Sequence, residues 1–251
     1  MATMAQTGSA GIVRGASYDS RFFSTMAVLI LATTAIGFSR TYYLNGLFHA
    51  PLPSRIIHLH ALVFTLWILL YVVQTALVPI GRIAIHKKLG IAAFGFACVT
   101  VAVGVMAGTD MLVRNDDFGT GIGAKTFCVI PFGTMAIFAP LMLGAFLARR
   151  APDVHKRLIL IANIALTFAP VARHPLSYIL DLAHTDQIFQ WSFLAMLVSY
   201  DLLSLHKIHK ATLAGGIFVV VTLHYLILIG MTSGWIAFAG WAQSMGRALH
   251  L

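Results

Sequence analysis

The chain has 251 residues, of which 59% are hydrophobic and only 10% are charged, and its mean hydropathy is +0.86. Soluble globular domains carry about 25% charged residues, so this composition excludes an ordinary soluble fold and indicates an integral membrane protein. The net charge of +9 comes from Lys and Arg near short loops, which suits lipid headgroups and does not indicate nucleic acid as a partner.

Residues 1–20 are polar and rich in small side chains, and they predict a flexible cytoplasmic tail before a single transmembrane helical domain over 21–251. The apolar stretches that follow are continuous rather than alternating, which is typical of helices, and each span needs about 20 residues. We predict an all-α polytopic bundle of about seven helices, with one leading helix and three helical hairpins. The spans are placed at 22–39, 59–80, 88–109, 126–148, 157–173, 188–205 and 212–238.

Positive charges are divided unevenly between the two sides of this arrangement. The side with the N-terminus and the loops near 81–88, 149–157 and 206–210 holds eleven of the 17 Lys and Arg residues, and the other side holds six. The positive-inside rule therefore places the N-terminus in the cytoplasm. We expect a multi-pass protein of a bacterial inner membrane, with the lipid bilayer as partner and a membrane complex or a homodimer as further candidates.

Three turns on the predicted cytoplasmic side look alike. They read GRIAIHKKLG, RRAPDVHKRLIL and LHKIHKATLAGG, and they place His86, His155 and His209 at the start of a downstream helix. Under one interpretation these histidines simply touch lipid headgroups. Under the other they form a three-histidine metal or anion site if the hairpins close into a ring, and three His ligands with an open position are a known zinc arrangement.

The second and fifth spans each carry a polar face. Steps of three or four residues along the second span give a stripe of His60, Phe64, Trp67, Tyr71 and Gln74. On the fifth span the residues that fall on one side are Asn163, Thr167, Pro170 and His174. The two faces lie at similar depth, so they are able to meet across a bundle.

Ionisable groups within a membrane are costly, which makes a functional role their default hypothesis. His224 is the deepest of the histidines, within the seventh span. Haem b is one cofactor that His60 and His174 would suit, since haem iron takes an axial His between apolar helices. A quinone pocket lined by Trp67, Tyr71, Gln74 and His174, an ion path, and plain packing of these histidines are the alternatives.

The motifs RTYYL at 40–44, HLHALVFTLWILLYVVQTALV at 58–78, GRIAIHKKLG at 81–90, DVHKRLIL at 153–160 and HKATLAGG at 209–216 together resemble a family of bacterial multi-pass inner-membrane proteins of uncharacterised activity. The resemblance covers about Phe22 to Leu228. More distantly, the arrangement is similar to helical membrane proteins that bind b-type haem or assist oxidase assembly. This resemblance implies a fold and a location. It implies no activity, because fold alone does not imply function.

Three hypotheses about function follow. The first is a redox or cofactor-binding protein that holds haem b or a metal, and the second is a small-molecule or ion transporter. The third is a non-catalytic subunit or assembly factor of a larger membrane complex. No hydrolase, nucleotide-binding or metalloprotease motif is present, so no catalytic residue is assigned.

Overall fold

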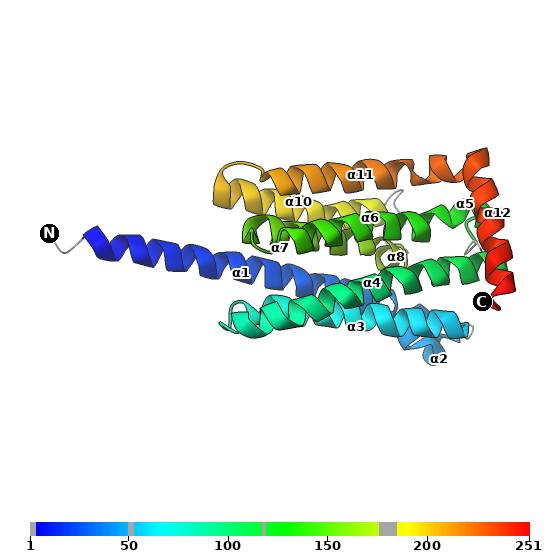
Figure 1. Ribbon diagram of the computed structural model, residues 1–251, viewed down its shortest axis with the longest axis horizontal. Helices are drawn as coiled ribbons and strands as arrows, with labels where there is room; N and C mark the ends of the chain where they lie inside the picture. Colours follow the sequence, from blue (N-terminus) through cyan, green and yellow to red (C-terminus); the bar gives the residue numbers. More distant parts are fainter. Residues whose placement is uncertain (1–3, 50–52, 117–118, 176–184) are drawn as a thin grey trace.

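The structure is a computed structural model that describes residues 4–49, 53–116, 119–175 and 185–251, and these residues form an all-α bundle (Figure 1). The long helices run roughly along one direction, and short helices lie at one end of them. The long helices are α1 Met4–Gly37, α3 Arg55–Leu77, α4 Ile83–Arg114, α6 Val129–Leu147, α7 Pro152–Leu166, α10 Thr185–Leu205 and α11 Lys210–Gly230. The shorter elements are the π-helical turn η1 Ser39–Tyr43, α2 Asn45–Phe48, α5 Ala124–Phe127, α8 Phe168–Ala172 and α12 Ser233–Ala248.

Seven helical stretches of the described chain are long and apolar enough to cross a membrane, which confirms the predicted number of spans. They are Asp19–Gly37, Arg55–Leu77, Ile83–Arg114, Ala124–Leu147, Pro152–Ala172, Gln187–Leu205 and Lys210–Gly230. Their outward faces are apolar, as on α3, where Leu62, Leu66, Leu69 and Val73 are exposed. Such continuous apolar surface is unusual on a soluble protein and is what a bilayer requires.

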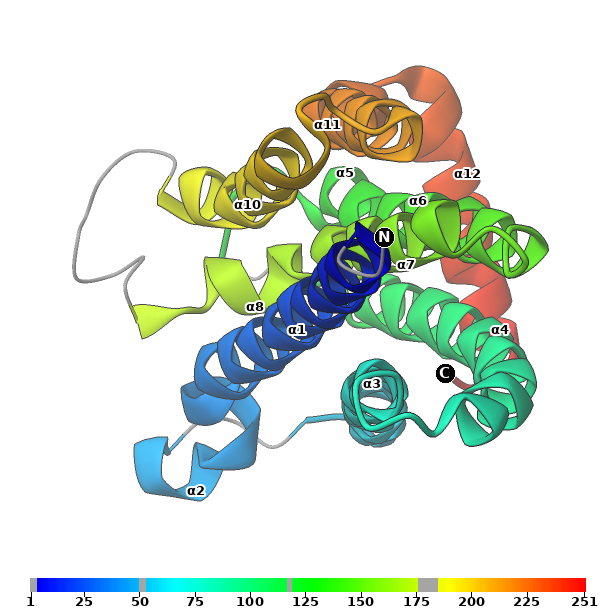
Figure 2. The ribbon, with the colours of Figure 1, turned by 90° about the vertical axis from the view of Figure 1, so that its left-hand side faces the viewer.

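Helix α7 lies in the middle of the bundle. Viewed along the bundle axis, the other long helices surround it (Figure 2), and it packs on α1, α6, α10 and α11. Arg157 and every residue from 160 to 165 are buried, so α7 is covered on all sides. A helix can be buried all round when its interior residues are small or have their polar groups paired.

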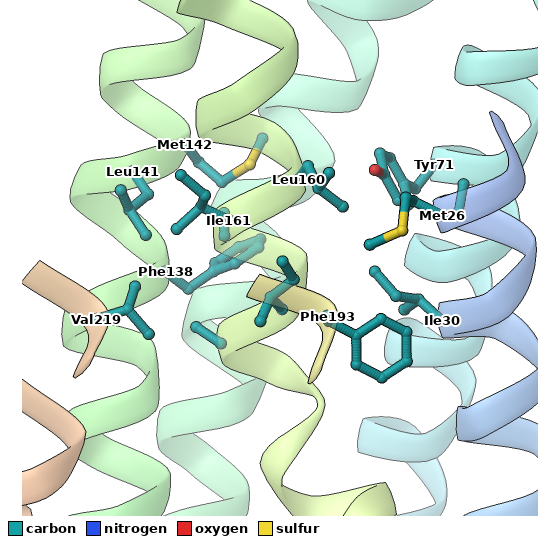
Figure 3. Close-up of a cluster of buried hydrophobic side chains, with 14 of the residues drawn as sticks. Met26, Ile30, Tyr71, Phe138, Leu141, Met142, Leu160, Ile161, Phe193 and Val219 are labelled. Atoms are coloured by element: carbon teal, nitrogen blue, oxygen red, sulfur yellow. The ribbon is translucent and has the colours of Figure 1, made fainter. Parts of the chain in front are cut away.

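The core is formed by side chains from six helices that converge on α7 (Figure 3). Met26 and Ile30 come from α1, Tyr71 from α3, Phe138 from α6 and Phe193 from α10, and all are buried. In the same way Gly104 and Gly108 of α4 lie against Met135 and Phe132 of α6. These two glycines form a GxxxG pattern, which here serves packing within the chain.

The predicted last span, 212–238, is shorter in the structure because the helix breaks. Helix α11 ends at Gly230, and α12 begins at Ser233, where the Thr232 hydroxyl accepts a hydrogen bond from Trp235 N at 3.3 Å. Helix α12 crosses the end of the bundle (Figure 1) and buries Ala242 and Gly246 against the rest of the protein. Its opposite face is exposed and apolar, as expected for a helix at a membrane surface.

The first helix starts earlier than predicted. Helix α1 begins at Met4, so residues assigned to the tail form its first turns, and these extend beyond the other helices (Figure 1). No proline interrupts the sequence between Met4 and Gly37. Since a helix satisfies its own backbone hydrogen bonds, the absence of a proline permits this continuation.

Candidate functional site

The three histidine-bearing turns lie at the same end of the bundle, the end from which α1 projects (Figure 1). They connect α3 to α4, α6 to α7 and α10 to α11. This end, called here the turn end, is the one predicted to face the cytoplasm. His86, His155 and His209 therefore share one side of the protein, as the repeat in the sequence predicts.

His86 and His155 occupy corresponding positions and make corresponding contacts. Each is the fourth residue of its helix, α4 or α7. His86 Nδ1 lies 3.1 Å from the backbone oxygen of Gln74, and His155 Nδ1 lies 2.8 Å from that of Ala145. Both carbonyls belong to the last four of the preceding helix, which have no partner within that helix. In the tautomer with its proton on Nδ1, each histidine donates to this carbonyl and so holds the two helices of its hairpin together.

The two imidazole rings are neighbours. The ring centroids of His86 and His155 are 6.4 Å apart, and the ring planes are nearly perpendicular, at 89°. Both side chains are only partly buried. Two hairpins that are far apart in the sequence therefore present one pair of imidazoles at the turn end.

Gln74 has the partner that its place in an apolar span requires. When its side-chain oxygen accepts from Gly90 N at 2.8 Å, its side-chain nitrogen donates to His86 Nδ1 at 2.7 Å. A neutral imidazole that accepts at Nδ1 carries its proton on Nε2. The orientation of the Gln74 amide therefore decides which ring nitrogen of His86 carries the proton.

His209 has a different role from the other two histidines. It precedes α11, and its Nδ1 accepts a hydrogen bond from Ala211 N at 3.1 Å, which makes it the N-cap. Within the described residues, no group of three or more His, Cys, Asp or Glu side chains is placed to hold a metal ion. The structure therefore supports a pair of histidines, not a trio, because His209 stands earlier relative to its helix.

Protonation of His209 is expected to weaken its cap. Partial burial lowers the pKa of His209 below its ordinary 6.5, and the Arg157 guanidinium lowers it further. Because the unfolded chain binds this proton more tightly, the stabilisation is complete above pH 6.5 and is lost as the pH falls through the folded-state pKa. The amount at stake is about 0.5–2 kcal/mol, the usual contribution of an N-cap.

A His209→Asn variant separates this effect from other titrations, because asparagine caps a helix and does not titrate. We expect the difference in unfolding temperature between about pH 8 and about pH 5 to be smaller in His209→Asn than in the wild type. Thermal unfolding of the two proteins in detergent at both pH values measures it. Equal pH dependence in both proteins would contradict this role.

An ionic network joins α1, α7 and α10 at the turn end. Lys156 of α7 pairs with Asp19 of α1, and also with Asp153 at 2.8 Å. The Tyr200 hydroxyl of α10 donates to the same Asp19 carboxylate. Asp19 was assigned to the tail and Lys156 to a loop, so neither was a candidate in the sequence analysis. Their charged side chains are ordinary near a membrane surface, and no local pattern reveals the contact.

Beneath this network lies a buried ion pair. Arg157 Nη2 and Asp201 Oδ1 are 2.6 Å apart, and the two side chains are 1% and 0% exposed. The guanidinium also donates through Nε to Asp201 Oδ1 at 2.9 Å, and Asp201 Oδ2 accepts from His209 N at 3.0 Å. The pair thus ties α7, α10 and the start of α11 together, and the one signal in the sequence was an Asp within an apolar span.

The polar faces predicted on the second and fifth spans meet in the middle of the bundle. Trp67 Nε1 donates to Asn163 Oδ1 at 3.0 Å, between α3 and α7. Trp67, Tyr71, Asn163 and Thr167 are all buried. The Tyr71 hydroxyl, although buried, has no hydrogen-bond partner among the described residues. The helical spacing of these residues therefore predicts the inward faces of both helices, and their burial agrees with it.

His60 and His174 lie on these faces toward the end of the bundle that is opposite the turn end. His60 packs its ring on Phe64, with 4.0 Å between centroids, and in the part of the chain that the structure describes its buried Nδ1 has no hydrogen-bond partner. His174 is 7% exposed, and its ring packs edge-on against Phe189 of α10 at 5.0 Å. Burial lowers the pKa of His174. The convergence of the two imidazoles on one cofactor stays a prediction.

His224 is placed apart from the other candidates. It lies on the exposed face of α11, and its ring contacts that of Tyr225, which is also exposed. The face of α11 that turns inward carries Val219 and Leu226 instead. The structure therefore does not bring His224 to the interior faces of α3 and α7, because its helical phase turns it outward.

Comparison of the chain with protein-family models, with curated protein sequences and with solved structures found no match. The resemblance to bacterial inner-membrane proteins therefore stays an expectation from the motifs. The structure itself shows a protein with seven helices suited to crossing a membrane. Its clearest chemical feature in the described residues is the His86–His155 pair.

Proposed function

We propose that this integral membrane protein is a redox protein that binds a b-type haem through His86 and His155. The observation that carries the proposal is the pairing of two imidazoles from separate hairpins, with ring centroids 6.4 Å apart. A metal–nitrogen bond to histidine is about 2.0–2.1 Å long, so His86 and His155 would be the two residues close enough together to hold one metal ion.

The hydrogen bonds of the pair suit metal ligands. A histidine that binds a metal ordinarily donates its other ring N–H to a carboxylate or a backbone carbonyl, which fixes the tautomer. His155 Nδ1 is within reach of the Ala145 carbonyl and His86 Nδ1 of the Gln74 carbonyl. Donation to these carbonyls leaves Nε2 of each ring free to bind a metal. For His86, the side-chain amide of Gln74 must first turn its N–H away from Nδ1.

The number of histidines favours haem over zinc. Structural zinc sites use four protein ligands and catalytic ones three, whereas the structure brings two imidazoles together. Haem iron needs only axial ligands from the protein. When bound, haem b supplies one-electron transfer. The residues of the chain hold the two rings in place and fix the nitrogen that carries the proton.

The proposal is tested on protein purified gently from a host supplied with haem precursors. The measurements are the visible spectrum before and after dithionite, and the iron content per chain. We expect a Soret band, and sharp α and β bands on reduction, in the wild type. His155→Asn should lose at least nine-tenths of both signals, because asparagine can still donate to the Ala145 carbonyl but does not ligate haem iron.

Two matched variants make the assignment specific. His224→Ala removes an exposed histidine on α11 and should leave the spectrum unchanged. His60→Ala tests the other prediction: loss of the spectrum in this variant alone would move the haem to the α3 face and overturn the assignment to His86 and His155. A wild-type protein with neither a chromophore nor bound metal would refute the redox function.

If the redox function is refuted, transport is the second candidate function. The observation behind it is the polar contact between Trp67 and Asn163 in the middle of the bundle. On the same face of α3 lies the Tyr71 hydroxyl, for which the described residues offer no hydrogen-bond partner. Polar groups in the interior of a membrane bundle often belong to a substrate or ion route. No contact among the described residues specifically supports the role of a subunit or assembly factor.

A further inference from the structure

The geometry points to a binding site for an anionic phospholipid between α10 and α11, with an acyl chain in an apolar groove and the phosphate at Lys207 and Lys210. This site is independent of the proposed haem. The groove consists of two adjoining hollows of about 320 Å³ and about 250 Å³ that share Leu194, Val198 and Val220. Its surface is almost entirely apolar, and it opens outward between the two helices.

The length of the groove suits an acyl chain. On α11 the lining runs from Thr212 to Val221. At 1.5 Å per residue this stretch is about 13 Å long, close to half of a hydrocarbon core of about 30 Å. The groove therefore matches one leaflet, the leaflet at the turn end.

The charges at the mouth of the groove complement a phosphate. Ile208, which lines the groove, stands between Lys207 and the start of α11 at Lys210. Both lysines are exposed, and in the described part of the chain neither forms an ion pair. Basic residues beside a groove between membrane helices are the usual recognition element for anionic headgroups.

The test compares phosphatidylglycerol with phosphatidylcholine of the same acyl chains. Each lipid is titrated into the delipidated full-length protein, and bound lipids are counted by native mass spectrometry. We expect the wild type to bind phosphatidylglycerol at least tenfold more tightly. Lys207→Gln with Lys210→Gln should lose that preference, while Lys87→Gln with Lys88→Gln, two exposed lysines at the same end of the protein, should keep it.

A Gly216→Leu variant tests the groove itself, because a Cβ on Gly216 would point at the Leu194 side chain 3.4 Å away and a larger side chain would fill the space. We expect it to lose binding of both lipids at this site. Equal affinity of the wild type for the two lipids, or equal losses in both lysine pairs, would overturn the proposal. A lipid-free dimer that Gly216→Leu dissociates would overturn it in favour of a second copy.

Discussion

Asp201→Asn is expected to be among the most destabilising single substitutions in this protein. Asparagine keeps the shape of the side chain but removes the buried counter-charge of Arg157, which is 1% exposed, and leaves it only the exposed Asp153 carboxylate 3.7 Å away. Removal of one partner from a buried ion pair costs about 3–5 kcal/mol, because the remaining charge stays in a medium that solvates it poorly. Thermal unfolding in detergent measures the effect. It is monitored as the loss of the monodisperse peak in size-exclusion chromatography.

Two controls separate the effect of burying the ion pair from the effect of removing a charge. Asp116→Asn removes an acid that pairs with Arg114 at the other end of the bundle, where both side chains are about a third exposed, at 37% and 30%. That substitution should cost no more than about 1 kcal/mol. The double variant Arg157→Met with Asp201→Leu should be more stable than Asp201→Asn, since no uncompensated charge remains. Equal stability of Asp201→Asn and wild type would show that Arg157 is solvated.

The periodicity of the sequence was enough to predict the inward faces of the helices. Trp67, Tyr71 and Gln74 fall on one side of a helix by spacing alone, and all three are buried. The same reasoning turned Asn163 and Thr167 inward on the fifth span. Only one helix has to be considered in each case, which is why a sequence pattern suffices.

Contacts between distant segments could not be predicted in this way. Arg157 was counted among the loop charges, because an arginine at the first turn after a loop is normally at the membrane surface. Its partner Asp201 lies 44 residues away, and only the packing of α7 against α10 brings the two together. The histidine repeat shows the same limit. The motif places His209 like the other two, but α11 begins one residue after it, whereas α4 and α7 begin before their histidines.

Gly37→Ala is the second substitution for which we expect a large effect. Gly37 is at the end of α1, where a Cβ would lie 2.1 Å from the carbonyl oxygen of Pro170 and 2.7 Å from its carbonyl carbon. Overpacking by one methyl group in a well-packed core typically costs about 1–3 kcal/mol. The cost at Gly37 should reach the upper part of this range or exceed it, because α8 must move as a backbone segment.

Two glycines of α4 serve as controls for Gly37. Among the described residues, no atom outside the local helix backbone lies within 4 Å of the position that a Cβ on Gly95 would take. Gly95→Ala should therefore raise stability by about 0.5–1 kcal/mol through helix propensity. At Gly104 a Cβ would lie 2.4 Å from Met135 Sδ, and Met135→Ala should relieve that clash. Pro170→Ala should not rescue Gly37→Ala, since the obstructing atoms are backbone atoms. Thermal unfolding of the single and double variants decides between the two cases: rescue at Gly104 but not at Gly37 shows that α1 and α8 touch through their main chains.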